Sequence, residues 1–167
     1  MYFFIFLNYV AWWAWPRADK IQYGGMSEEI IYPVSPKDEI EGIPYFARMC
    51  HKIRLERDGE LHADYQSNLG GGFGLWICQF LTVEYTELVK VVRDGASDAE
   101  ALQWAKDQGA KLESPGIDWW LSYMRNRGYA DDLAEILEKR KIEAGFGNRD
   151  DIASFFDFID ADEGRLN

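Results

Sequence analysis

The chain has 167 residues, of which 47% are hydrophobic and 16% aromatic, enough apolar material for one well-packed domain. Its formal net charge is -11; the first 25 residues carry a net charge of +1, so residues 26–167 carry -12. Such a surface repels phosphate backbones and anionic lipid headgroups, which disfavours nucleic acids and membrane surfaces as partners. A membrane would be a partner only if residues 1–25 formed a genuine anchor.

Residues 1–15 are almost unbroken apolar sequence, and two basic residues follow at Arg17 and Lys20. The apolar run is shorter than the roughly 20 residues that span a bilayer, and a signal peptide carries its basic residues before such a run. Three interpretations stay open: a hydrophobic leader before a working start at Met26, a short membrane-associating anchor, or a signal-like segment. The abrupt change of composition at Met26 favours the leader. We therefore expect residues 1–25 to lie outside the fold and residues 26–167 to form one domain.

Helix signals begin at Ser35-Pro36-Lys37-Asp38, where a capping serine precedes proline and an acid, and Gly42 would end this short helix. Residues 43–57 repeat apolar side chains at intervals of three and four, which predicts an amphipathic helix that ends at Asp58-Gly59. Residues 60–74 contain many turn formers and predict a long, ordered, Gly-rich loop. The apolar run 75–81 allows a strand or a buried helix, and we expect the helix because no hairpin signal follows it.

Further helices are expected beyond that run. Thr82 would cap a helix that ends at Gly95, and the capping box of Ser97 and Glu100 opens the next. Ser114-Pro115 starts another helix, residues 131–144 form one more, and the last carries an apolar stripe over residues 152–159. No convincing strand alternation occurs, so the sequence predicts a single compact all-α domain of six or seven helices.

The run Gly70-Gly71-Gly72-Phe73-Gly74 opens an apolar segment that we expect to be helical. Free N–H groups at a helix start can bind an anion, and glycines let the ligand approach. The spacing matches neither the dinucleotide fingerprint nor the P-loop. A tight connection between loop and helix explains the glycines about as well as an anion site does.

Positive charge gathers on the polar side of residues 43–57, where Arg48, Lys52 and Arg54 lie. Arg48 and Lys52 are one helical turn apart and face the same way, so they could hold a carboxylate or a phosphate. The alternative, favoured by how common such pairs are, is that these cations pair with the protein's own acids.

The sequence contains no recognisable metal or cofactor motif, and we expect neither group. Cys50 and Cys78 lie in apolar runs and are expected to be buried, reduced thiols of a cytoplasmic protein. His51 and His62 lack partners at the spacing of a metal site or a catalytic nucleophile.

Two other clusters are better explained by structure than by binding. The acids of residues 157–163 do not complete a calcium loop, and we expect a solvated helix end there. Trp119-Trp120 with Tyr123 could stack on a flat ligand, but at helical spacing one of each adjacent pair must face the core, so core packing is the default.

Four segments are distinctive as a set: Ser35-Pro36-Lys37-Asp38-Glu39-Ile40-Glu41-Gly42, Arg48-Met49-Cys50-His51-Lys52-Ile53-Arg54, Asp64-Tyr65-Gln66-Ser67-Asn68-Leu69-Gly70, and the closing stretch from Arg149 to Gly164. Together they resemble a bacterial family of small proteins described only as a domain of unknown function. The resemblance covers roughly residues 33–165, and it implies no known reaction, cofactor or catalytic residue. It departs at His51 and Gly74, where many relatives carry Asp, which weakens a catalytic role for His51.

Three functions follow as hypotheses. The first is a binding module for a small anionic ligand or an acidic peptide, in a cleft between the helix 43–57 and the loop 64–74. The candidate ligand-binding residues are Arg48, Lys52, Arg54, Asp64, Tyr65, Asn68, Gly70 and Gly72. The second is an enzyme acting on a small metabolite, with Asp64 or Tyr65 in proton transfer. The third is a structural or regulatory protein that uses exposed aromatic side chains as an interface.

Overall fold

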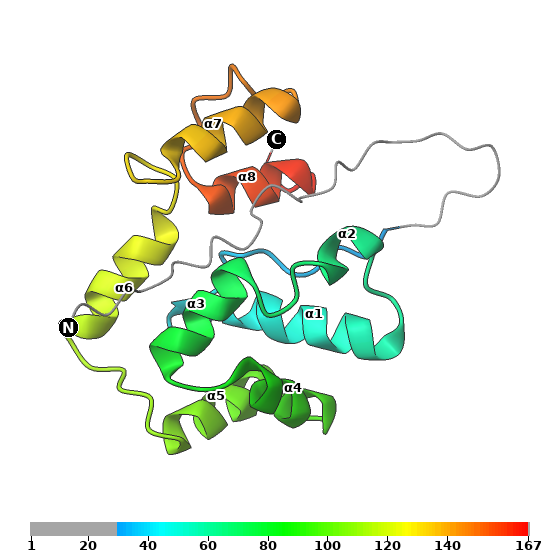
Figure 1. The fold of residues 1–167 in the computed structure, drawn as a ribbon, viewed down its shortest axis with the longest axis vertical. Helices are drawn as coiled ribbons and strands as arrows, with labels where there is room; N and C mark the ends of the chain where they lie inside the picture. The colour runs from blue at the N-terminus through cyan, green and yellow to red at the C-terminus, as the bar shows by residue number, and fades with distance from the viewer. Residues whose placement is uncertain (1–29, 167) are drawn as a thin grey trace, which may run out of the picture.

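The computed structural model describes residues 30–166 (Figure 1). The predicted leader at residues 1–25 lies outside this described part of the chain, as does Met26. Residues 30–166 form eight α-helices and one small hairpin, so the predicted all-α class is confirmed. One of the helices, α2 (Ala63–Gln66), has only 4 residues. Among the described residues, no helix combines the length and the hydropathy needed to cross a bilayer.

The predicted helix at Ser35–Asp38 is wrong, because a turn and a hairpin occupy this region. The Ser35 hydroxyl accepts the backbone N–H of Lys37 at 3.1 Å, which closes a local turn in place of a helical one. Strands β1 (Glu39–Ile40) and β2 (Ile43–Pro44) then pair antiparallel. The two residues between the strands, Glu41 and Gly42, have φ of +50° and +82°, the positive values that a tight hairpin turn requires.

Helix α1 (Phe46–Asp58) lies at the centre of the domain, where it packs against α3 (Gly72–Leu81), α4 (Tyr85–Arg93) and α5 (Asp98–Asp107) (Figure 1). It is the helix predicted over residues 43–57. Its apolar stripe is at most 1% exposed and consists of Phe46, Met49, Cys50 and Ile53. Gly59 ends the helix with φ of +76°, the left-handed conformation that glycine adopts most readily.

The Gly-rich loop is shorter than predicted. Helix α2 occupies part of it, and α3 begins at Gly72, so Gly72 and Gly74 are helical. The predicted buried helix is confirmed within α3. Thr82 does not cap the next helix: it ends α3 with φ of +56°, and Glu84 precedes α4.

The second half of the described chain adds α6 (Gly116–Arg125), α7 (Ala134–Glu143) and α8 (Phe155–Asp162). Helix α7 packs against α8, and α6 contacts strand β2 (Figure 1). The predicted capping box of Ser97 and Glu100 opens α5, and a second one, formed by Ser154 and Asp157, opens α8. These local hydrogen bonds satisfy N–H groups that a helix start leaves free.

The predicted core packing is confirmed for Trp120 but not for Trp119. Trp120 stacks on Phe80 with ring centroids 4.2 Å apart, whereas Trp119 is 71% exposed. Adjacent helical positions point in different directions, so only one of the two rings can face inward. Cys50 and Cys78 are buried free thiols, and burial raises the pKa of Cys78 to about 12.

Candidate functional site

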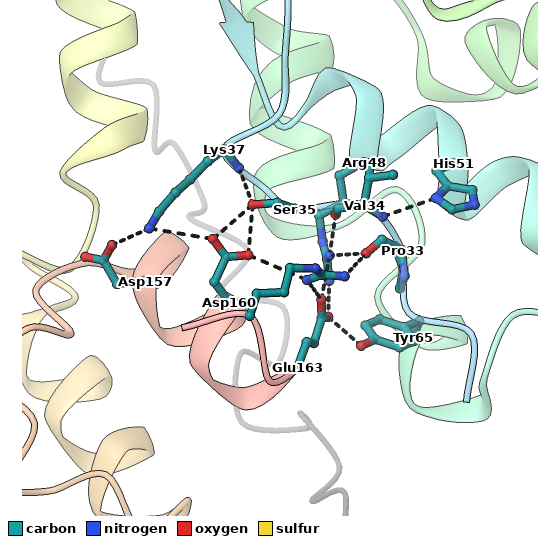
Figure 2. Close-up of polar contacts among 11 residues, drawn as sticks. Pro33, Val34, Ser35, Lys37, Arg48, His51, Tyr65, Asp157, Asp160 and Glu163 are labelled. Carbon is teal, nitrogen blue, oxygen red and sulfur yellow. Dashed lines mark hydrogen bonds and ion pairs between the residues drawn. The ribbon is translucent and has the colours of Figure 1, made fainter. Parts of the chain in front are cut away.

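The two ends of the described chain meet at α8 (Figure 2). The Ser35 hydroxyl donates to the carboxylate of Asp160 at 2.8 and 2.9 Å from its two oxygens. Lys37 Nζ lies 2.7 Å from Asp157 Oδ1 and 3.6 Å from Asp160 Oδ2. Asp157 and Asp160 are three residues apart, so they share a face of α8 and together hold the segment 33–37 against it.

Beside these contacts, Arg48 of α1 and Glu163 form a buried ion pair. Arg48 Nη1 donates to Glu163 Oε2 at 3.0 Å, and Nη2 donates to Oε1, a two-pronged geometry in which each side chain is 1% exposed. Arg48 Nη1 also lies 2.7 Å from the carbonyl oxygen of Val34 and 3.2 Å from that of Pro33. One guanidinium therefore binds both the end of α8 and the backbone that precedes the hairpin.

Tyr65 and Arg165 complete the surroundings of the Glu163 carboxylate. The Tyr65 hydroxyl donates to Oε1 at 2.5 Å, and Arg165 donates to Oε2 and to the Pro33 carbonyl. Each oxygen of Glu163 thus accepts two hydrogen bonds. We call the following residues the Glu163 cluster: Ser35, Arg48, Tyr65, Asp160, Glu163 and Arg165.

The Glu163 carboxylate is charged at neutral pH and both its oxygens accept hydrogen bonds, whereas the buried Arg48 Nε has no hydrogen-bond partner among the described residues. Burial alone would raise the pKa of Glu163, but the hydrogen bonds and charge of Arg48 hold that pKa below its usual value. Burial and the negative charge of Glu163 raise the pKa of the Tyr65 hydroxyl, so the phenol keeps its proton. An arrangement with all its acceptor oxygens in use is suited to holding chain segments together.

The other cations predicted on α1 have partners of their own. Lys52 is buried and donates to the Tyr45 hydroxyl at 3.0 Å. Arg54 lies 2.7 Å from Asp98 Oδ1 and donates to the Ala96 carbonyl at 2.9 Å. The structure therefore brings Arg48 and Tyr65 together in one cluster, whereas Lys52 and Arg54 contact different groups.

The remaining predicted residues lie along α2 and the start of α3. Asp64 has Oδ2 3.4 Å from His62 Nδ1, and the buried Asn68 Nδ2 has no hydrogen-bond partner among the described residues. Gly70 has φ of +70°, and a Cβ added there would lie 2.7 Å from the ring of Tyr85. Gly72, with φ of +51°, is the first residue of α3. Gly70 is therefore explained by close packing against an aromatic ring.

A pocket of about 500 Å³ opens beside the Glu163 cluster, with walls from the hairpin, the end of α6 and the start of α8. Its polar lining consists of Lys37, Glu39, Arg125, Asn126, Ser154 and Asp157. Its apolar lining consists of Pro44, Tyr129, Ala153 and Phe156. We call this cavity the hairpin pocket; the residues predicted to bind a ligand from the sequence do not line it.

Two ion pairs line the hairpin pocket, Lys37 with Asp157 at 2.7 Å and Arg125 Nη2 with Glu39 Oε1 at 2.6 Å. The Lys37 and Arg125 side chains are 45% and 46% exposed, so a ligand can reach both. Burial would lower the pKa of Lys37, but the hydrogen bonds and negative charges of Asp157 and Asp160 together raise it. Burial likewise would raise the pKa of Asp157, and hydrogen bonds from Lys37 and Ser154 lower it instead.

The acidic face of α8 is the feature that sequence reasoning missed. A solvated helix end is the wrong description of Asp160 and Glu163, since only 6% and 7% of each whole residue, backbone included, is exposed. The available signal is their spacing, because Asp157, Asp160 and Glu163 recur at intervals of three along a segment whose other positions, Asp162 excepted, are apolar. Among residues 30–166, no group of three or more His, Cys, Asp or Glu side chains is placed to hold a metal ion.

The model of DUF5069, a domain of unknown function, matches residues 30–165 of the chain. The chain belongs to the DUF5069 family. No curated protein and no solved structure matches it. The resemblance found in the sequence to a family of unknown function is thereby confirmed.

In this DUF5069 domain, the four segments that carry the resemblance come together in space. The first supplies Ser35 and Lys37, the second supplies Arg48, and the third supplies Tyr65. The closing segment supplies Asp157 and the buried acids Asp160 and Glu163 (Figure 2). Apart from Arg165, the Glu163 cluster is thus built from the segments by which the sequence is recognised, and so is one wall of the hairpin pocket.

Proposed function

We propose that this DUF5069 domain is a binding module for a small anionic molecule, which it holds in the hairpin pocket. The observation that supports this most is the pair of half-exposed cations, Lys37 and Arg125, in one cavity of about 500 Å³. Cavities of roughly 300–1,000 Å³ with an apolar lining and a few polar groups are typical of small-molecule sites.

The pocket offers different contacts to the two parts of such a molecule. Arg125 is placed to bind a carboxylate or phosphate, since the guanidinium fork matches the geometry of both groups. Phe156, which is 2% exposed, forms an apolar floor, and the 65% exposed ring of Tyr129 supplies a surface against which an apolar portion can pack. The Glu163 cluster positions the wall of the pocket that contains Lys37, because Ser35 and Arg48 hold the chain segment that carries this lysine.

The other place for the anion is the cleft predicted from the sequence, along α1 and the first turn of α3. Arg48, Lys52 and Arg54 are each paired within the protein there. An anion would have to replace those partners, two of which hold buried cations, and leaving a buried group without its partner is costly. This difference favours the hairpin pocket.

The buried free thiols Cys50 and Cys78 support a reducing compartment, and we place the module in the cytoplasm.

Calorimetric titration and thermal unfolding of the full chain with inorganic phosphate and a set of small carboxylates test the proposal. A ligand at 100 times its Kd is expected to add about 2.7 kcal/mol to the free energy of unfolding. Arg125→Gln should weaken binding about tenfold, which corresponds to about 1.4 kcal/mol. If no anion binds, or if binding survives Arg125→Gln unchanged, the proposal is wrong.

Arg93→Gln is a matched control for this variant. Arg93 is 43% exposed and pairs with Glu56, much as the 46% exposed Arg125 pairs with Glu39, but Arg93 does not line the hairpin pocket. Both substitutions remove one cation and one surface ion pair from the protein. Only a contact between Arg125 and the ligand makes their effects on the Kd differ.

A further inference from the structure

The hairpin pocket contains its own carboxylates beside its cations. Glu39 forms an ion pair with Arg125, and Asp157 forms one with Lys37. A ligand that is only an anion competes with these carboxylates and leaves the displaced one without a cation. The net charge of -11 adds a repulsive field for such a ligand.

The two ion pairs differ in which hydrogen-bond donors and acceptors they leave available to a ligand. Lys37 Nζ lies 2.7 Å from Asp157 Oδ1 and 3.6 Å from Asp160 Oδ2, and Arg165 Nη1 also pairs with Asp160 at 3.5 Å, so the charges on this side of the pocket balance. Ser154 and Ala153 also donate backbone N–H groups, but only to Asp157 Oδ2, whereas Oδ1 faces Lys37.

Arg125 leaves donor capacity on the other side. Its Nε and Nη2 both donate to the same oxygen of Glu39, at 3.2 and 2.6 Å, and Nη2 also lies 3.4 Å from the Gly42 carbonyl. No described residue accepts from its Nη1. The pocket therefore has acceptor capacity left at Asp157 Oδ1, on the Lys37 side, and donor capacity left at Arg125 Nη1.

We infer that the ligand of the hairpin pocket is a small zwitterion, whose anionic group binds Arg125 and whose ammonium group binds the Asp157 carboxylate. This inference rests on the proposed function: it keeps the anionic group at Arg125 and adds a cationic group to the ligand. A molecule of zero net charge is not repelled by the acidic protein, and its ammonium can donate to Asp157 Oδ1, whose partner in the structure is Lys37. The apolar portion between its charged groups packs over Phe156 and beside Tyr129.

The test is calorimetric titration of the full chain with α-amino acids and with straight-chain ω-aminocarboxylates of increasing length. Each zwitterion is compared with the carboxylate that lacks its amine and with the amine that lacks its carboxylate. The best zwitterion should bind at least about tenfold more tightly than either matched compound. Arg125→Gln should weaken the zwitterion and the carboxylate and leave the amine unchanged, and Arg93→Gln should change none of them.

Each outcome decides between the claims. Carboxylates that bind as tightly as the zwitterions overturn the zwitterion and leave the anion module standing. Amines that bind as tightly as the zwitterions contradict both, because the anionic group then contributes nothing. If no compound binds at about 10 mM, while phosphate or another simple anion does, only the zwitterion is wrong; if nothing binds, both proposals are.

Discussion

Arg48 and Glu163 lie 115 positions apart in the chain and form a two-pronged ion pair in which each side chain is only 1% exposed. Moving two charges out of water costs several kcal/mol per ion, so such a pair is tolerated only when further hydrogen bonds complete it. Tyr65, Arg165 and the carbonyls of Pro33 and Val34 supply those bonds. The pair ties α1 to α8 and to the segment that forms one wall of the hairpin pocket.

Glu163→Gln is expected to lower the free energy of unfolding by about 3–5 kcal/mol, because it leaves the buried Arg48 without its counter-charge. Urea denaturation of the variant and the unchanged protein measures this difference. Glu87→Gln is the control: Glu87 is 52% exposed and pairs with Lys90 at the surface, so its loss should cost less than about 0.5 kcal/mol. A loss below about 1 kcal/mol for Glu163→Gln would mean that the pair contributes little.

Tyr65→Phe removes the hydroxyl that donates to Glu163 at 2.5 Å and keeps the ring in the core. A hydrogen bond to a charged group contributes about 1.5–3 kcal/mol, and we expect a loss of that size in the same denaturation experiment. Tyr129→Phe should leave stability nearly unchanged, since Tyr129 is 65% exposed. Equal effects of the two substitutions would contradict the role given to the Tyr65 hydroxyl.

Local patterns predicted most of the helices, because their causes lie within a few residues. The capping box of Ser97 and Glu100 and the stop at Gly59 are examples. Ser35-Pro36 shows the limit of the same reasoning. Its pattern is that of a helix start, but the Ser35 hydroxyl bonds to Asp160, 125 positions away, and the following residues pair as a hairpin.

The candidate site was harder to predict, since its partners are distant in the sequence. The positive face of α1 and the acids after residue 157 are both visible in the sequence, and the preference for pairing with the protein's own acids describes Arg48 correctly. Which acid pairs with which cation depends on how α8 packs, and no periodicity encodes that. The hairpin pocket was missed for the same reason, because Lys37 and Arg125 come from segments 88 positions apart.

The stability of the domain should fall on acidification through Glu163 and Asp157. The pKa of each carboxyl is held below its ordinary value of about 4.3 for Glu or 3.9 for Asp, so the unfolded chain takes up protons before the folded one does as the pH falls. Their stabilisation is complete above about pH 5 and is lost as the pH falls through the folded-state pKa values. Urea midpoints between pH 7 and pH 3 should decline less steeply for Glu163→Gln than for the unchanged protein, and parallel profiles would contradict this assignment.

Gly70→Ala tests whether this glycine serves packing. Its φ of +70° costs an alanine about 1–2 kcal/mol, and the new Cβ would also meet Tyr85 at 2.7 Å. Gly59→Ala is the matched control, because its φ of +76° is similar and no neighbouring atom lies within 4 Å. Gly70→Ala should therefore destabilise the domain by about 1–3 kcal/mol more than Gly59→Ala does. If both variants lose the same free energy of unfolding, and only Gly70→Ala binds the ligand more weakly, then the ligand binds at the Gly-rich segment.

The most direct test of the central claim is two-dimensional NMR of the full chain, titrated with the tightest-binding anion or zwitterion. If the hairpin pocket is the site, the backbone amide signals that shift should cluster at Lys37, Glu39, Asn126, Ser154 and Asp157, with the Arg125 side-chain signals among them. Shifts concentrated instead at Arg54, Asn68 and residues 70–72 would show that the ligand binds along α1 and the start of α3, and would contradict the assignment to the hairpin pocket.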